Sequence, residues 1–340
     1  MNTKNDFKLL TLTEEKELNR DELIEYYCKL REYVMARKLT NTTVGATSIA
    51  PKLKNVTNKI AMKLTKLICD DNLEYNVTGQ ENIPTGTVLF AHTHQGLLDN
   101  FAWIPATPQH CLIFHSVKVR NALLLAQLNT GLILVDKDNK NSRKNAKLDT
   151  IKLLIKGHSV SIFPESAYLL SPNKLHLPIN YGFLDIAKKT GVPVVPVVDE
   201  YTYTPDSKVV KIDIAFCKPI YVSIFDDLSQ KLNEYEEEIS TKRFELIEKK
   251  GVYSRDSISN QEYIAFLKKN KEVLQMGKID IDVERKNLWG ATDGFYDFHH
   301  INDIPYDNNN NNFLDTREVM RIKRIDENQR LKNLTRNIHS

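Results

Sequence analysis

A histidine and an aspartate, His94 and Asp99, lie five positions apart directly after a short hydrophobic run that ends at Phe90. A carboxylate beside an imidazole fixes which ring nitrogen carries the proton, and it leaves the other nitrogen free to accept one. On one continuous helix, residues five apart point about 140° away from each other, given ~3.6 residues per turn. We therefore predict a strand that ends near His94, a turn at Gly96 and a helix that begins near Asp99, which together bring the carboxylate back to the ring.

Length and composition favour one large α/β domain with appendages. The 340 residues include 47 Lys and Arg against 44 Asp and Glu, a net charge of +3, which does not indicate a nucleic-acid partner. The 4 cysteines are scattered and form no C-x-x-C pair, which is typical of a reducing compartment and indicates neither a zinc site nor a disulfide framework. No signal-peptide core and no run of ~20 apolar residues is present. We expect a cytoplasmic protein that does not span a membrane.

Between residues 76 and 225, short apolar runs alternate with helical patterns. This alternation predicts an α/β fold with a largely parallel central sheet covered by helices. Sites in such sheets gather at the carboxyl ends of the strands, where both His94 and the segment after Phe163 are expected to lie. The expected strands are 88–90, 111–114, 132–135, 160–163, 194–198 and 210–215, and the expected helices between them are 121–129, 143–156 and 182–189.

Helical extensions are predicted on both sides of this domain. Residues 51–70 combine an apolar stripe with a lysine-rich face. Such a helix can lie on an anionic membrane surface, or it can pack on the domain with its lysines in solvent. We divide the chain into an N-terminal helical segment (1–75), the main domain (76–225) and a charged helical C-terminal region (226–340). The helices expected in the extensions span 13–38, 51–70, 226–250 and 261–275, and a loop spans 40–48.

Three further stretches follow the His94–Asp99 pair. Gly131–Lys137 is a strand that ends in charge, Phe163-Pro164-Glu165-Ser166 lies at another strand end, and Gly191–Val197 leads into a strand rich in valine and proline. In this order and spacing the four stretches resemble the motif blocks of the glycerolipid acyltransferase family, which includes lysophosphatidic acid acyltransferases. The resemblance covers about residues 76–198.

The resemblance implies transfer of an acyl group from acyl-CoA or acyl-carrier protein to a hydroxyl of a lysophospholipid or a related acceptor, with no metal and no prosthetic group. An alcohol is a weak nucleophile at neutral pH and needs an aligned base. His94 is expected to be that general base and Asp99 to orient it, as in a Ser-His-Asp triad in which the substrate supplies the hydroxyl. Backbone N–H groups near Gly96 are candidates to stabilise the oxyanion.

The sequence departs from the family pattern where the acceptor phosphate is expected to bind. The third block of the family reads Phe-Pro-Glu-Gly-Thr-Arg, but here Ser166, Ala167 and Tyr168 follow Glu165, and Lys137 takes the place of the second-block arginine. Arginine binds phosphate with a planar fork, lysine with a point charge and tyrosine with no charge. We therefore predict an altered acceptor, with either Tyr168 against a neutral or sugar-like group or Lys174 against a phosphate. The predicted substrate-binding residues are Lys137, Phe163, Pro164, Glu165, Ser166 and Tyr168.

Two other interpretations stay open. His92 and His94 face the same side of one strand, which is similar to the metal-binding His-x-His of amidohydrolase barrels; that interpretation requires further His and Asp ligands. The missing arginine instead suits a non-catalytic lipid-binding module with an acyltransferase-like fold. The acyltransferase interpretation, with its apolar substrates, predicts a peripheral protein on the cytoplasmic face of a membrane.

Overall fold

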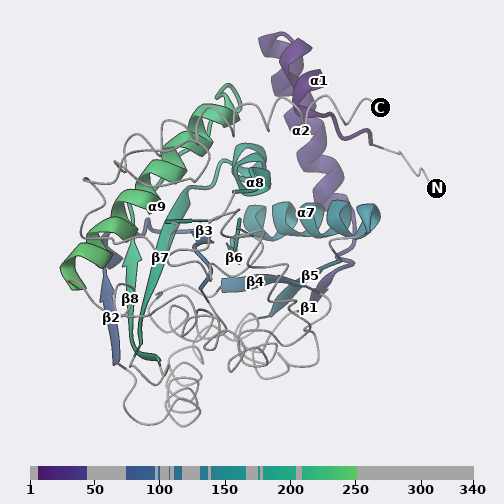
Figure 1. Cartoon of the computed structure of the whole chain (residues 1–340). Helices are drawn as coiled ribbons and strands as arrows, with labels where there is room; N and C mark the ends of the chain where they lie inside the picture. Colours follow the sequence, from purple (N-terminus) through teal and green to yellow (C-terminus); the bar gives the residue numbers. More distant parts are fainter. Residues whose placement is uncertain are drawn as a thin grey trace.

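The computed structural model describes residues 7–43, 74–95, 99, 107, 111–116, 131–136, 139–165, 175–176, 179–203 and 209–250. Within these residues, eight strands form one sheet in the order β1-β5-β4-β6-β3-β7-β8-β2 (Figure 1). The strands are β1 (Thr42–Thr43), β2 (Glu74–Thr78), β3 (Leu89–His92), β4 (Cys111–Ser116), β5 (Leu132–Val135), β6 (Ser159–Ile162), β7 (Val194–Tyr203) and β8 (Val209–Phe216). The helices are α1 (Leu12–Glu17), α2 (Arg20–Ala36), α7 (Lys140–Ile155), α8 (Gly182–Thr190) and α9 (Leu228–Lys250), with one 3₁₀ turn, η2 (Gln80–Asn82).

Most neighbouring strands run parallel, which confirms the predicted fold class. The pairs β5–β4, β4–β6, β6–β3, β3–β7 and β8–β2 are parallel, whereas β1–β5 and β7–β8 are antiparallel. Because β3, β4, β5 and β6 are parallel, their carboxyl ends meet at one edge of the sheet. β7 is longer than its neighbour β3 and continues past the end of that strand, so its last residues lie beside the segment that carries His94.

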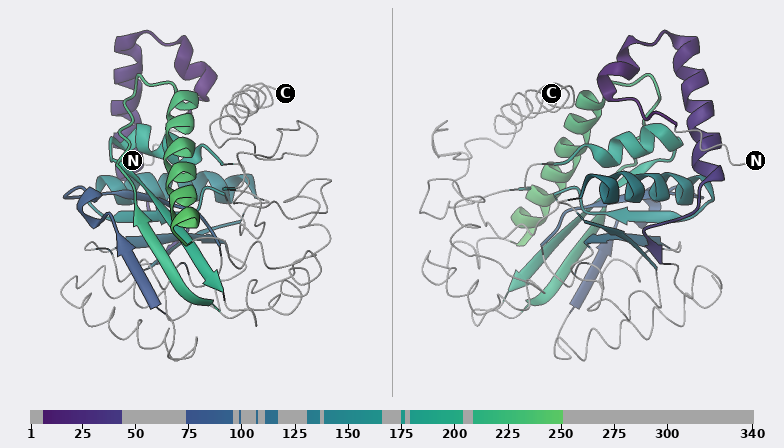
Figure 2. Two further views of the ribbon diagram at one scale, coloured as in Figure 1. Left: turned by 60° about the vertical axis from the view of Figure 1, so that its left-hand side comes forward. Right: turned by 90° about the vertical axis from the view of Figure 1, so that its right-hand side faces the viewer.

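Both faces of the central strands are buried, which explains why they read as unbroken apolar runs. In β3, Leu89 and Ala91 belong to the core that the strands share with α2, α7, α8 and α9, whereas Phe90 belongs to a second core on the opposite face. The described helices α7, α8 and α9 lie together on one side of the sheet (Figure 2). None of the helices in the described ranges is long and apolar enough to cross a membrane.

The predicted strands and the helices of the main domain are confirmed wherever the structure describes them, but the N-terminal helix is not continuous. The expected helix 13–38 is two helices, because Asn19 breaks it and caps the second one. The Asn19 side chain accepts hydrogen bonds from the N–H groups of Asp21 and Glu22, and the Glu22 carboxylate accepts one from the N–H of Asn19. The short strand β1 lies inside the expected loop 40–48, and β2 precedes the first expected strand. The expected helices 51–70, 121–129 and 261–275 lie outside the described residues.

Helix α9, expected as part of a charged C-terminal region, packs against β7 and α8. The hydroxyl of Tyr235 donates a hydrogen bond of 3.3 Å to the carbonyl of Ala91 in β3, and Leu232 and Ile239 are fully buried. α9 thus shares one core with the sheet. The division of the chain at residue 225 remains a prediction.

Helix α1 is attached to α8 by a buried group of charges. The Lys189 ammonium lies 2.6 Å from the Glu15 carboxylate and 2.5 Å from the Asp185 carboxylate. Burial alone would raise the pKa of Asp185, but the ammonium groups of Lys147 and Lys189 outweigh burial and lower this pKa below its usual value. The N-terminal helices are therefore held by paired charges as well as by apolar packing.

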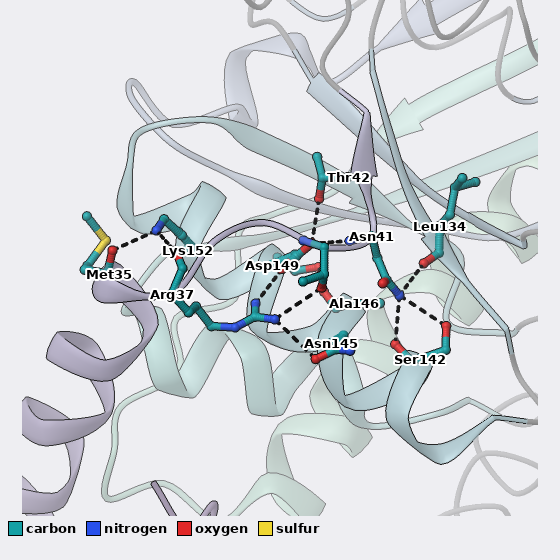
Figure 3. Close-up of polar contacts among 12 residues, drawn as sticks. Met35, Arg37, Asn41, Thr42, Leu134, Ser142, Asn145, Ala146, Asp149 and Lys152 are labelled. Atoms are coloured by element: carbon teal, nitrogen blue, oxygen red, sulfur yellow. Dashed lines mark hydrogen bonds and ion pairs between the residues drawn. The ribbon is translucent and has the colours of Figure 1, made fainter. Parts of the chain in front are cut away.

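A second buried carboxylate, Asp149 of α7, fixes the chain between α2 and β1 (Figure 3). It accepts hydrogen bonds from the N–H groups of Thr40 (2.9 Å) and Asn41 (2.8 Å), from the Thr42 hydroxyl (3.0 Å) and from the Arg37 guanidinium. These contacts satisfy backbone donors that no helix or sheet would satisfy, and they bring β1 to the edge of β5.

Replacing Asp149 by Ala is therefore expected to lower the free energy of unfolding by about 3–5 kcal/mol, the typical cost of breaking a largely buried ion pair. Urea unfolding followed by circular dichroism measures this loss. Glu25→Ala, which breaks the exposed Glu25–Lys29 pair on α2, is the control and should leave the midpoint unchanged. An Asp149→Ala protein as stable as the control would show that the cluster does not hold the N-terminal segment.

Candidate active site

His94 and Asp99 meet at the carboxyl end of β3, as the sequence predicted. The ring nitrogen Nδ1 of His94 lies 2.7 Å from Oδ2 of Asp99. The Asp99 side chain is fully buried, whereas 12% of the His94 side chain remains exposed. An ionised carboxylate only accepts hydrogen bonds, so Nδ1 carries the proton and Nε2 is the nitrogen able to accept one. The pair therefore has the geometry of an oriented general base.

Asp99 is held by two further donors. Its Oδ2 also accepts the backbone N–H of Gln95 at 2.8 Å, and its Oδ1 accepts the hydroxyl of Tyr201 from β7. With donors on both oxygens, the carboxylate has little freedom to rotate, and the orientation that it imposes on the imidazole is fixed.

The Phe-Pro-Glu stretch supports His94 from the neighbouring strand. β6 pairs with β3 through Ile162 and Ala91, so the residues after both strands lie side by side. Oε1 of Glu165 accepts the backbone N–H of His94 at 3.0 Å, and the ring of Phe163 stacks on the imidazole with centroids 4.0 Å apart. The carbonyl of Pro164 accepts two hydrogen bonds from Asn180, at 3.0 Å from the backbone N–H and 2.9 Å from Nδ2.

Phe163 and Glu165 were predicted to bind substrate, yet each of them contacts His94, and Pro164 is anchored to Asn180. Their role in substrate binding remains a prediction, and the structure adds a positioning role for Phe163 and Glu165. The other predicted substrate-binding residues, Lys137, Ser166 and Tyr168, lie outside the described residues, as do Gly96 and Lys174.

His92 differs from His94 in its surroundings. It is fully buried, and its Nδ1 lies 3.7 Å from the buried carboxylate of Asp199. Burial, with a smaller effect of His94, lowers the pKa of His92 well below its usual value. Burial also raises the pKa of Asp199 well above its usual value, and the nearby charge of Asp99 adds to this effect. Both directions favour neutral side chains, so His92 and Asp199 are suited to the sheet interior rather than to acid–base chemistry.

The metal-dependent interpretation of His92 and His94 gains no support from the described part of the chain. Within it, no group of three or more His, Cys, Asp or Glu side chains is arranged to hold a metal ion. The sheet is also open, with β1 and β2 at opposite edges, whereas that interpretation predicted a barrel.

The sequence reasoning missed a set of residues that holds the His94–Asp99 pair from β7 and α9. Nε2 of Gln95 donates to Oε2 of Glu200 at 2.8 Å, and Oε1 of Gln95 accepts the N–H of Tyr201 at 2.9 Å. The guanidinium of Arg243 lies 3.0 Å from the same oxygen of Glu200. The available signal was the run Asp199-Glu200-Tyr201 at the end of an otherwise apolar strand, because polar residues that continue such a strand mark the site edge of the sheet.

Residues 74–199 match a family model described as Acyltransferase. This stretch of the chain is therefore similar to acyltransferases. A 1-acyl-sn-glycerol-3-phosphate acyltransferase from Borreliella burgdorferi is 28% identical to the chain over 165 residues, which cover 48% of this chain and 65% of the length of that relative. The crystal structure of the 1-acyl-sn-glycerophosphate (LPA) acyltransferase PlsC from Thermotoga maritima aligns with 68% of this chain and 90% of its own, with 21% identity and a TM-score of 0.47. The matched residues include His94, Asp99 and Glu165, whereas α1, α2 and α9 lie outside them.

Proposed function

We propose that the protein transfers a fatty acyl group from an acyl thioester, acyl-CoA or acyl-carrier protein, to a hydroxyl of a lysophospholipid or a related lipid. His94 is the general base and Asp99 orients it. The observation that carries this proposal is the 2.7 Å contact between His94 Nδ1 and Asp99 within an acyltransferase domain, with the His94 side chain still partly exposed. The reaction needs no metal and no prosthetic group.

The proposed reaction begins when Nε2 of His94 takes the proton of the acceptor hydroxyl as its oxygen attacks the thioester carbonyl. Asp99 stabilises the imidazolium that forms. General base catalysis of this kind contributes ~10²–10⁴-fold in rate. The tetrahedral intermediate then breaks its carbon–sulfur bond, and the leaving thiolate takes the proton back from the imidazolium. The products are an ester and a free thiol, and His94 returns to its starting form.

The sequence is most informative about the lipid that accepts the acyl group. The Borreliella burgdorferi relative is named for 1-acylglycerol-3-phosphate, so that lipid is the reference acceptor. In this chain Lys137 and Tyr168 stand where the family carries arginines, and a phosphomonoester then loses two bidentate partners. We propose that a lysolipid with a neutral or sugar-like headgroup is the better acceptor.

A panel of lysolipid acceptors with radiolabelled acyl-CoA and acyl-carrier protein tests this proposal. Wild-type protein is expected to form labelled diacyl lipid, with slower turnover of lysophosphatidic acid than of an acceptor without a phosphomonoester. His94→Ala is expected to lower kcat by ~10²–10⁴-fold, because the base is removed. His158→Ala is the control, since His158 precedes β6 and so lies at the amino end of that strand, away from the carboxyl ends where His94 lies.

Three outcomes of this panel would contradict parts of the proposal. Fast turnover of lysophosphatidic acid would contradict the altered acceptor. A His94→Ala protein with wild-type kcat would contradict the role of His94. Lipid binding by a wild-type protein that forms no product with any donor would instead favour the non-catalytic lipid-binding module.

We also propose that the protein acts as a peripheral protein at the cytoplasmic face of a membrane, because its acceptor and product are membrane lipids. The lysine-rich segment 51–70 is the candidate contact with anionic headgroups; it lies outside the described residues. In a flotation assay the protein is expected to migrate with anionic vesicles at low salt and to be released as salt screens the charges. Neutral vesicles are the control, and failure to float with anionic vesicles at low salt would contradict the proposal.

A further inference from the structure

Arg243 brings a positive charge from α9 into the interior of the domain. It is fully buried, and it is the bulkiest of the fully buried side chains among the described residues. It lies in α9, beyond the stretch 74–199 that matches the acyltransferase family. Burying a guanidinium is costly unless it is paired, so its partners show what the burial achieves.

Two partners of Arg243 lie outside α9, one at the end of β7 and one after the Phe-Pro-Glu stretch. Nη2 lies 3.0 Å from Oε2 of Glu200 at the end of β7, and Nη1 donates a hydrogen bond of 3.2 Å to the carbonyl of Leu175, which follows the Phe-Pro-Glu stretch in the chain. Glu200 is itself 2% exposed. Its Oε2 also accepts a hydrogen bond from the side-chain amide of Gln95. One carboxylate oxygen therefore forms an ion pair with the guanidinium and a hydrogen bond with the amide.

The alternation of side chains along β7 explains how a charge on α9 can affect the opposite face of the sheet. Glu200 and Tyr201 are consecutive, so they point to opposite faces. Glu200 contacts Arg243, and Tyr201 donates its hydroxyl to Asp99. Gln95 connects the two, because its side chain contacts both Glu200 and the backbone of Tyr201 while its own N–H donates to Asp99.

We propose that Arg243 is a positioning residue of the active site, which acts through Glu200 and Gln95 on the carboxylate of Asp99. Helix α9 is then a working part of the catalytic domain, although the family match ends before it. This role rests on the proposed acyl transfer for its kinetic consequence, but the effect on the His94–Asp99 contact does not depend on any substrate.

Removing the guanidinium leaves the Glu200 carboxylate buried without its cation. An unpaired buried carboxylate either takes up a proton or moves toward another donor. In both cases the side-chain amide of Gln95 loses its charged acceptor on Glu200. The backbone N–H of Gln95 and the backbone of Tyr201 are then no longer held in their present positions. Displacements of about 1 Å at a catalytic pair lower rates by about 10²-fold.

The test compares Arg243→Met, which keeps the length of the side chain but not its charge, with Arg243→Lys, which keeps the charge. Leu232→Ala is the matched control, since Leu232 is also fully buried on α9 but contacts none of these residues through a hydrogen bond or ion pair. Two quantities are measured at a temperature at which each protein is folded. One is kcat and KM for acyl transfer, and the other is the proton NMR signal of His94 Nδ1–H, assigned by its absence in His94→Ala.

Arg243→Met is expected to lower kcat by about 10- to 100-fold with little change in the KM for the acyl donor, and to weaken or broaden the His94 signal. Arg243→Lys should restore most of kcat and the signal. Leu232→Ala should lower the thermal midpoint yet keep the wild-type kcat and signal. If Arg243→Met does not fold, the double variant Arg243→Met with Glu200→Leu, which leaves no unpaired charge, replaces it and is expected to show the same losses.

An Arg243→Met protein with the kcat and the His94 signal of the Leu232→Ala control would overturn the proposal, because a purely structural arginine predicts that result. If wild-type protein transfers no acyl group to any acceptor, the proposed function fails, while the His94 signal alone decides the role of Arg243.

Discussion

The contact between the His94 ring and the Asp99 carboxylate is the interaction on which the rest of the site depends. The two residues are five apart in the sequence, and they meet just beyond the end of β3 at His92. Several further contacts at this edge of the sheet constrain one partner of that pair. Glu165 and Phe163 hold the backbone and ring of His94, while Gln95 and Tyr201 hold the carboxylate. A base that is fixed before substrate binds needs no free energy to reorient during the reaction, which is why preorganisation contributes to rate.

The parallel sheet makes this arrangement possible. Side chains from β3, β6 and β7 come from distant parts of the sequence, but parallel strands end at a common edge, where their following residues can meet. β7 adds a second constraint because it continues past that edge, where it pairs antiparallel with β8. Its consecutive side chains there point to opposite faces of the sheet. The helices on one face then contribute as well, through Arg243. Stability and positioning are thus provided by the same buried groups.

The fold class and the central pair were predictable from sequence because each depends on local patterns. Buried parallel strands read as apolar runs, and the spacing of His94 and Asp99 around a glycine indicated a turn. The break at Asn19 was missed because the apolar periodicity of 13–38 continues across it, and only the capping geometry shows that the helix stops. Glu200 and Arg243 were missed for a different reason. Their pairing joins β7 to a helix 43 positions later, and no local pattern records a contact of that kind.

The single-turnover rate of acyl transfer in Asp99→Asn shows whether the Asp99 carboxylate makes His94 a general base. Asparagine keeps the shape of the side chain but can donate to Nδ1, and it thereby favours the wrong tautomer of the imidazole. We expect a rate ~10²–10⁴-fold below wild type with lipid binding retained. A rate within about threefold of wild type would contradict it, since a general base contributes far more than that.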